Sequence, residues 1–265
     1  MRDRAPLSDR AWAEVDAEAT RSLKHFLAAR RIVDFQGPFG WQHSSVDLGR
    51  VHGLDSGPVA GTAAALRKVL PLVELRSPFS MLRAELDVAE RGATDLDLGP
   101  VIEASRHAAM AEDTAVFHGY DDAAIRGIAS STPHPAIVVG DDYSRYPKHV
   151  ADAVALLRAA DVAGPYAIAL GARAFTGVTE STEHGGYPVL HHLREILGGP
   201  VIWAPSVDGA VVVSQRGGDF EMTVGEDFAV GYSSHDADVV NLYIEESFTF
   251  RINAPEAAVH LAYRA

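Results

Sequence analysis

Residues 44–78, SSVDLGRVHGLDSGPVAGTAAALRKVLPLVELRSP, differ in pattern from the rest of this chain. Their first part is poor in large apolar side chains and is interrupted by Gly49 and Gly53. Asp55-Ser56-Gly57-Pro58 is typical of a turn, after which the chain returns through residues 63–76. We therefore predict a long two-stranded arm. An isolated hairpin is marginally stable in water, so the arm should rest on its parent domain or on a neighbouring subunit.

Outside the arm, the hydrophobic pattern predicts helices mainly in the first two thirds of the chain and strands mainly in the last third. Ser8 is a candidate N-cap, and apolar residues follow it at steps of three and four. The expected helices cover residues 9–30, 80–91, 97–118, 148–160, 172–180 and 188–197, and residues 129–147 are expected to form a loop. The expected strands cover residues 30–35, 166–170, 210–213 and 220–224, with one more at 240–244 and another at 248–252. This order is typical of an α+β protein.

Composition and charge exclude several classes of protein. The 265 residues are enough for one large domain or two modest ones. The net charge of −13 argues against a nucleic-acid partner and against an anionic membrane surface. The absence of cysteine excludes disulfides and thiolate sites. No stretch approaches the roughly 20 apolar residues that span a bilayer, and the N-terminal residues lack a signal-peptide core, so a cytoplasmic protein is expected.

The common catalytic motifs are absent from the sequence. Ser233-Ser234-His235-Asp236 contains the residue types of a hydrolase triad, but adjacent residues point in different directions, so we interpret it as a polar turn between two strands. A second cluster carries imidazole and carboxylate groups of the kind that bind zinc or iron. The cluster consists of Glu180, Glu183, His184, His191 and His192, and Gly185-Gly186 interrupts it. This irregular spacing favours an exposed loop over a metal site.

A third cluster contains four carboxylates. Asp95 and Asp97 are explained by the favourable charge of an acid at the start of a helix. Glu112 and Asp113 are neighbours on a predicted helix and therefore face different ways. A chain with much ordered structure, an unsupported arm and no catalytic constellation favours a structural or assembly role over an enzyme.

Several short motifs follow one another along nearly the whole chain: Ala11–Val15, Gly37–Trp41, Glu85–Gly92, Ala111–Asp113, Phe117–Tyr120, Gly164–Tyr166, Trp203–Pro205, Arg216–Phe220, Gly231–Asp236 and Glu246–Phe250. Each is weak alone. Together they resemble the encapsulin family of bacterial and archaeal shell proteins, in its linocin-like family 1.

The resemblance implies the tailed-phage major capsid fold of the Hong Kong 97 type. Residues 1–43 would form the N-terminal helix and the start of a peripheral domain, 44–78 an extended loop, 79–125 the peripheral domain with its long helix, and 126–220 an axial domain. Residues 221–250 would add peripheral strands, and 251–265 would return to the axial domain. In the family the extended loop pairs with neighbouring subunits, which would supply the support that the arm lacks.

The same resemblance implies a shell that encloses a cargo enzyme, such as a dye-decolorising peroxidase or a ferritin-like protein, with roles in iron storage or oxidative stress. The smallest icosahedral form, T=1, has about sixty copies. The total charge would be on the order of −780, which repels nucleic acid. A prophage major capsid protein that packages DNA is the alternative with this fold. A bacteriocin or protease would need a catalytic group that the sequence does not offer.

Cargo of this family docks through a short C-terminal peptide between the N-terminal helix and the peripheral domain. Apolar side chains would form the groove and charges would orient an extended peptide. The residues carried over are Phe26, Arg30, Arg31, Ile32, Asp34, Phe228, Val230, Asp238 and Val240. Phe26, Ile32 and Val240 are also compatible with simple core positions.

The histidine-rich segment corresponds to the loop that lines the five-fold pore in this family. The carried-over residues are Glu180, Glu183, His184, Gly185, Gly186 and Tyr187. A ring of carboxylates would favour cations such as ferrous iron. Some members bind a flavin on the shell. The aromatic residue that would stack on it is replaced here by Ala84, so no cofactor is expected.

Overall fold

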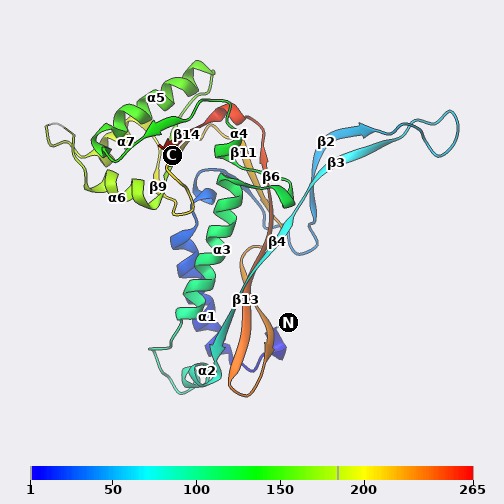
Figure 1. Cartoon of the computed structure of the whole chain (residues 1–265). Coiled ribbons are helices and arrows are strands. Elements are labelled where there is room, and N and C mark those ends of the chain that lie inside the picture. The colour runs from blue at the N-terminus through cyan, green and yellow to red at the C-terminus, as the bar shows by residue number, and fades with distance from the viewer. Residues whose placement is uncertain (1, 184, 265) are drawn as a thin grey trace.

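Two long helices and a long strand form the stem of the molecule. The computed structural model describes residues 2–183 and 185–264. Helices α1 (Asp9–Phe26) and α3 (Gly99–Phe117) lie side by side along the stem, and α2 (Arg83–Glu90) lies at its lower end in Figure 1. The hydroxyl of Ser8 caps α1 by accepting a hydrogen bond from the backbone N–H of Ala11 at 3.1 Å. The predicted helix N-cap is therefore confirmed.

The first sheet is built on β13 (Val239–Ile252), which runs along the stem. Strand β4 (Val73–Leu82) pairs antiparallel with β13. Strands β11 (Phe220–Val224) and β12 (Ala229–His235) pair with successive stretches of β13, and residues 225–228 bulge between them. The short β1 (Asp34–Gln36) pairs in parallel with β11. Two further short strands, β5 (Gly119–Tyr120) and β6 (Ile125–Arg126), pair with each other beside the stem.

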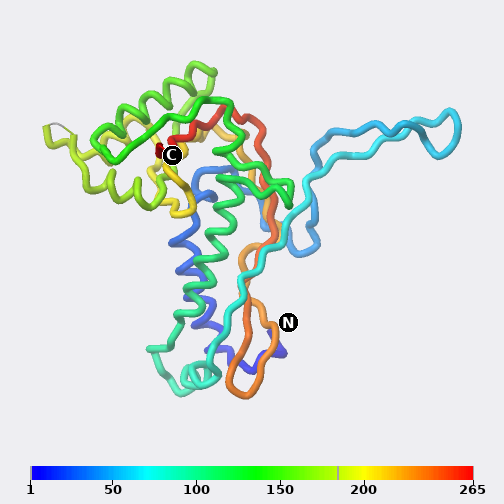
Figure 2. The backbone as a smooth tube through the Cα atoms, viewed as in Figure 1, coloured from blue at the N-terminus to red at the C-terminus, as the bar shows by residue number. Residues whose placement is uncertain are grey.

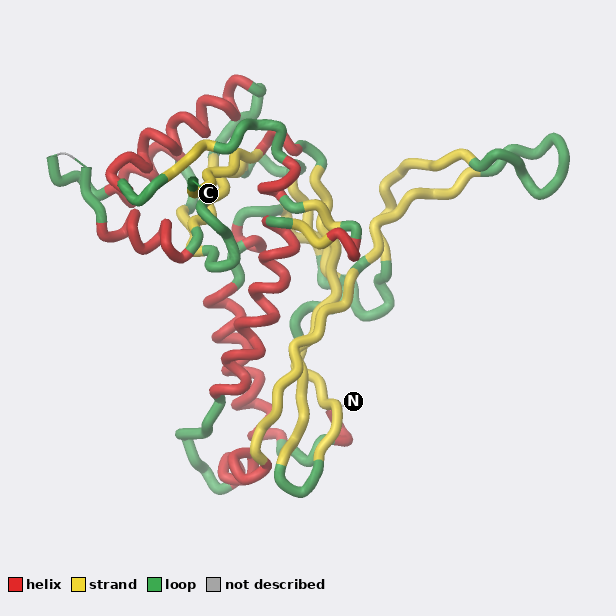
Figure 3. Tube along the Cα trace, viewed as in Figure 1, coloured by secondary structure: helices red, strands yellow, loops and turns green. Residues whose placement is uncertain are grey.

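The second sheet lies in the upper lobe, with helices around it (Figures 1 and 3). Its strand order is β7 (Ile137–Val139), β14 (Ala258–Tyr263), β10 (Ala210–Ser214), β8 (Tyr166–Leu170) and β9 (Val201–Trp203). The helices are α4 (Ile128–Ser131), α5 (Tyr146–Ala159), α6 (Ala172–Glu180) and α7 (Val189–Leu197). Every side chain of β8 and β10 is buried, as their continuous apolar runs predict. The last described strand therefore returns to this lobe.

The predicted arm is present as β2 (Ser45–Gly53) and β3 (Ala65–Pro71), which pair antiparallel. Figure 2 shows the hairpin projecting away from the rest of the chain. Only Leu72 separates β3 from β4, so the arm continues a strand of the first sheet. Most of its side chains are exposed, including Val51, Leu66 and Val69.

The buried apolar residues form two clusters along the stem. The upper core contains the second sheet with its helices, Ala115–Phe117 of α3 and Phe248 of β13. The lower core contains the buried face of α1, the first half of α3 and Val240, Leu242 and Ile244 of β13. Helix α3 and strand β13 thus pass through both cores.

Several predicted element boundaries are wrong. The helix expected over 9–30 ends at Phe26, and a short 3-10 turn, Ala29–Arg31, replaces the start of the strand expected over 30–35. The helix expected over 80–91 begins at Arg83, because the preceding residues pair with β13. The two strands expected at 240–244 and 248–252 are one continuous β13. The loop expected over 129–147 contains part of α4, all of β7 and the 3-10 turn Tyr143–Arg145.

Candidate functional site

A buried polar layer separates the upper core from the lower core. On α3, Glu112 is fully buried between Ala109 of the lower core and Ala115 of the upper core. On β13, the buried Glu246 lies between Ile244 and Phe248 in the same way. Charged side chains are seldom buried unless they are paired, so this layer requires a cation.

Arg30 supplies that cation from the turn after α1. Its guanidinium contacts Glu112 at 2.5 Å, Asp227 at 2.6 Å and Glu246 at 3.0 Å. It also lies over the ring of Phe228, with 4.7 Å between the guanidinium carbon and the ring centroid. One side chain thus joins the turn after α1 to α3, to the bulge between β11 and β12, and to β13. The planar guanidinium fork suits this many contacts, whereas a lysine ammonium would not reach them all.

Asp113 fixes the chain turn that delivers Arg30. Its carboxylate accepts hydrogen bonds from the backbone N–H groups of Ala28 at 3.0 Å and Ala29 at 2.9 Å. These bonds explain why the helix predicted to continue to residue 30 stops earlier. The two neighbouring acids on α3 do face different partners, as predicted, but the sequence did not indicate that both are fully buried.

Burial shifts the pKa values of this layer. Burial and the charge of Glu112 raise the pKa of Asp113 to about 8, against the opposing effect of the two backbone N–H groups. Burial and Glu112 also raise the pKa of Glu246 well above its ordinary value. Burial disfavours the charge on Arg30, but its three carboxylate partners outweigh that effect and raise its pKa. We infer that protons held by Asp113 and Glu246 reduce the excess of negative charge around Arg30.

A groove lies between α1 and the start of β12. It has a volume of about 260 Å³ and is lined by Arg2, Asp16, Ala19, Thr20, Leu23, Phe228, Ala229, Val230 and Ile244. An ion pair between Arg2 and Asp16, at 2.6 Å, lies among these residues. Apolar walls with a charged pair are suited to an extended peptide.

The structure places the nine predicted groove residues in different environments. Phe228 and Val230 line this groove, and Arg30 lies against Phe228. Phe26 packs its ring against Trp203, with 5.8 Å between centroids, and Arg31 is exposed. Ile32 and Val240 are buried in the upper and lower cores, which matches the core positions also considered for them. Arg2, Thr20, Leu23 and Ile244 were missed, because only the packing of α1 on the sheet brings them together.

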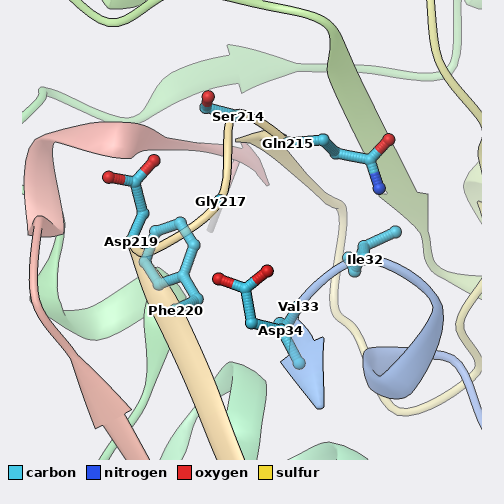
Figure 4. A pocket seen from close by; sticks show the side chains of 8 residues that line it. All are labelled: Ile32, Val33, Asp34, Ser214, Gln215, Gly217, Asp219 and Phe220. Carbon is cyan, nitrogen blue, oxygen red and sulfur yellow. The ribbon is translucent and has the colours of Figure 1, made fainter.

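The two remaining acids of the predicted groove lie elsewhere. Asp34 lines a small pocket beside the loop between β10 and β11 (Figure 4). Its carboxylate accepts a hydrogen bond from the backbone N–H of Gly218 at 2.5 Å. Asp238 lies in the turn between β12 and β13, where its carbonyl accepts a hydrogen bond from the N–H of Arg83 at the start of α2. Both residues stabilise local backbone structure.

The segment with the predicted pore residues forms the connection between α6 and α7. The bridge between Thr182 and Pro188 closes it, and Glu183 and His192 are paired at 2.8 Å. The hydroxyl of Tyr187 donates to Glu195 at 2.9 Å, and this bond raises the pKa of Tyr187. Figure 1 shows the connection at the outer tip of the upper lobe. Glu180 ends α6, Gly185 and Gly186 adopt positive φ angles, and His184 lies outside the described residues.

The other polar clusters carry no catalytic geometry. Ser233, Ser234 and His235 belong to the end of β12, so the turn expected over residues 233–236 begins only at Asp236. There the carboxylate of Asp236 accepts hydrogen bonds from the backbone N–H groups of Asp238 and Val239. Within residues 2–183 and 185–264, no three His, Asp or Glu side chains are grouped to hold a metal ion. In the same ranges, no helix is long and apolar enough to cross a membrane.

Comparison with known proteins assigns this arrangement to a family. A family model described as "Encapsulating protein for peroxidase" matches residues 1–249. The chain belongs to the encapsulin shell protein family. A type 1 encapsulin shell protein of Rhodospirillum rubrum is 52% identical, with 98% of this chain and 95% of that protein covered. A type 1 encapsulin shell protein of Mycobacterium tuberculosis is 43% identical, with 99% and 98% covered.

Solved structures show the same fold for this encapsulin chain. A virus-like particle from Pyrococcus furiosus matches with a TM-score of 0.67 at 17% identity, covering 94% of this chain and 98% of that chain. The Microbacterium phage Oxtober96 matches with a TM-score of 0.57 at 12% identity, covering 90% and 91%. The predicted encapsulin membership and the capsid-type α+β fold are therefore confirmed. The chain is a structural shell protein, and its family encloses other proteins in a multimeric assembly.

Proposed function

We propose that about sixty copies of this chain assemble into a closed T=1 icosahedral shell in the cytoplasm. The single observation that carries this proposal is the arm, which projects from the rest of the chain, here called the body. The arm exposes apolar residues such as Val51, Leu66 and Val69. An exposed strand pair of this length is an aggregation hazard unless another chain covers it. The proposal includes the division of the chain into a peripheral domain, an axial domain and an extended loop, because these names describe positions in the shell.

The test is the size and shape of the purified protein. Size-exclusion chromatography followed by cryo-electron microscopy should give hollow particles of one diameter with icosahedral symmetry. A stable monomer or dimer at micromolar concentration would contradict self-assembly. A particle with more than about sixty copies would retain assembly but contradict the T=1 form.

The proposed content of the shell is a cargo enzyme, either a dye-decolorising peroxidase or a ferritin-like protein. The family description supports a peroxidase. Enclosure of either enzyme would connect the shell with oxidative stress or with iron storage. The net charge of −13 per chain disfavours the alternative, a capsid that packages DNA, because phosphate requires a basic surface.

The proposed docking site for the cargo is the groove between α1 and β12. Leu23, Phe228 and Val230 would contact the apolar side chains of an extended C-terminal cargo peptide, with the buried Ile244 beneath them. Arg2 with Asp16 would orient the peptide. Arg30 holds Phe228 in place through the contact described above.

A fluorescent protein carrying the C-terminal segment of the organism's own peroxidase would test this site. Co-expressed with the shell, it should co-purify with wild-type particles. Thr20→Arg, which fills the groove at the solvent side of α1, should reduce the enclosed fluorescence by about tenfold or more at unchanged particle yield. The matched control is Thr94→Arg, an exposed threonine between α2 and α3 that does not line the groove. Equal loading of both variants would contradict the site.

The proposed pore lies at the connection between α6 and α7. Five copies would place Glu183 and its neighbours around one axis, where carboxylates attract small cations. Glu183→Ala, combined with His184→Ala, should slow ferrous-iron entry into a ferritin-loaded shell without changing assembly. Unchanged uptake kinetics would contradict the pore assignment.

A further inference from the structure

Three arginines converge on a cavity at the root of the arm. The cavity has a volume of about 350 Å³ and lies between the arm strands and the end of β13. Arg50 of β2, Arg126 of β6 and Arg251 of β13 line it together with apolar residues. Within the described parts of the chain, neither Arg50 nor Arg126 makes an ion pair, so their charges are free to bind an anion.

The guanidinium group of Arg251 has hydrogen-bond partners for only some of its donors. One terminal nitrogen of its guanidinium pairs with Glu221 on β11. Its Nε is buried and has no hydrogen-bond partner among the described residues. A buried donor without a partner costs free energy, which an incoming acceptor would recover. A carboxylate that reached this nitrogen would supply the missing acceptor.

The arm itself is basic in an acidic protein. Within residues 44–78, Arg50, Arg67, Lys68 and Arg76 outnumber Asp47, Asp55 and Glu74 by one, so the rest of the chain carries −14. In the hairpin register Arg50 lies directly opposite Lys68. Like charges directly opposite each other destabilise a strand pair, so an anion bound beside Arg50 and Lys68 would stabilise the arm.

We propose that Arg50, Arg126 and Arg251 form a carboxylate-binding socket that receives an acidic side chain from a second copy of this chain. The inference rests on the proposed assembly, since the second copy is delivered by the shell. The guanidinium fork matches a carboxylate in a two-point contact. The partner body carries the net negative charge that would supply it. Occupation of the socket fixes the arm relative to its own body, because Arg50 lies on the arm and Arg126 and Arg251 lie on the body.

Chemical crosslinking tests the socket directly. The variant Arg126→Lys introduces an amine at the socket, and a carbodiimide joins an amine to a carboxylate that contacts it. Particles assembled from mixed unlabelled and nitrogen-15-labelled chains should give crosslinked peptides of mixed isotope composition, which identifies an interchain bond. Arg158→Lys, an exposed site on α5 with no ion pair in the described ranges, is the matched control.

The outcomes separate the socket from the assembly. Intact particles that give only single-isotope crosslinks, or none, would overturn the socket while the shell proposal stands. Density for a free phosphate in the cavity of assembled particles, without an interchain crosslink, would also overturn it. Absence of particles from the wild-type chain would overturn the assembly itself.

Charge reversal gives a second measurement. Arg50→Glu combined with Arg126→Glu should reduce the fraction of chains in particles by about tenfold or more, because a carboxylate would then face carboxylates. Circular dichroism of the unassembled chain should remain like that of wild type, since both side chains are exposed in the single chain. Particle yields equal to wild type would contradict the proposal.

Discussion

The arm and the second sheet are both β-structure, yet they are stabilised in opposite ways. Every side chain of β8 and β10 is buried within one chain, whereas β2 and β3 expose most of theirs. Burial of apolar surface supplies most of the favourable free energy of folding. The lobe can therefore fold as part of a single chain, whereas the arm buries little apolar surface against its own chain.

A substitution in the polar layer between the two cores should cause the largest loss of stability of the body. Arg30→Ala would leave Glu112, Asp227 and Glu246 without their shared cation, and loss of one partner of a buried ion pair costs about 3–5 kcal/mol. The expected result is a large loss of soluble protein and a lower unfolding temperature. Arg158→Ala is the exposed control. Equal unfolding temperatures for the two variants would show that the layer contributes nothing to the body.

A matched pair of leucines should separate the body from the arm. Leu170 of β8 is completely buried, and Leu66 of β3 is 59% exposed. Leu170→Ala should lower the free energy of unfolding by about 2–5 kcal/mol, because it removes packed methyl groups from the upper core. Leu66→Ala should change the stability of the unassembled chain by no more than about 0.5 kcal/mol.

The measurement for this pair is denaturant unfolding of the dissociated chain, followed by the particle yield after reassembly. Leu66→Ala should then lower the particle yield although it leaves the single chain intact. If Leu66→Ala destabilised the single chain as much as Leu170→Ala does, the arm would be part of the body's core and the contrast between the two regions would be lost.

The most gradual expected effect is a pH dependence confined to the body, which changes stability by at most about 1.4 kcal/mol for each pH unit. The pKa of Asp113 rises from 3.8 to about 8 on folding, so the folded chain keeps a proton that the unfolded chain loses in this interval. Its contribution to stability is therefore complete below about pH 4 and is lost as the pH rises towards 8, by at most about 1.4 kcal/mol per pH unit. Asp113→Asn should flatten this decline, because the amide does not ionise and its oxygen can still accept from the backbone of Ala28 and Ala29.

The decline in stability with rising pH is measured as the unfolding temperature at several pH values between 5 and 8. Asp122→Asn, on the exposed surface, is the control. About 1 kcal/mol corresponds to roughly 2–4 °C for a chain of this size class. The same pH profile for wild type and Asp113→Asn would exclude Asp113 as its source. A change in particle number, rather than in unfolding temperature, would place the effect in the arm.

Local patterns predicted the elements whose partners are close in sequence. Ser8 and the apolar stripe behind it placed the first helix, and the alanine-rich stretch placed α3 within two residues at each end. The errors lie where distant segments intervene. Asp113 ends the first helix through backbone hydrogen bonds across 84 and 85 positions. Pairing with β4 keeps β13 continuous through Glu245 and Glu246.

The candidate site was predicted less completely for the same reason. Phe228 and Val230 were found through family resemblance, whereas Thr20, Leu23 and Ile244 join them only when α1 packs on the first sheet. Ile32 and Val240 have the apolar character expected of a groove, but that character is equally suited to a core. Burial could not be read from residue type alone.

The sequence alone determined the α+β class, the arm, the absence of cysteine chemistry and the acidic charge that disfavours nucleic acid. These follow from residue counts and local periodicity, which require no knowledge of distant contacts. Only the tertiary structure revealed that Arg30, Glu112, Asp227 and Glu246 meet in one buried layer and that Arg50, Arg126 and Arg251 meet at the arm's root. Their chemistry depends on a distance between residues far apart in the chain, and packing sets that distance.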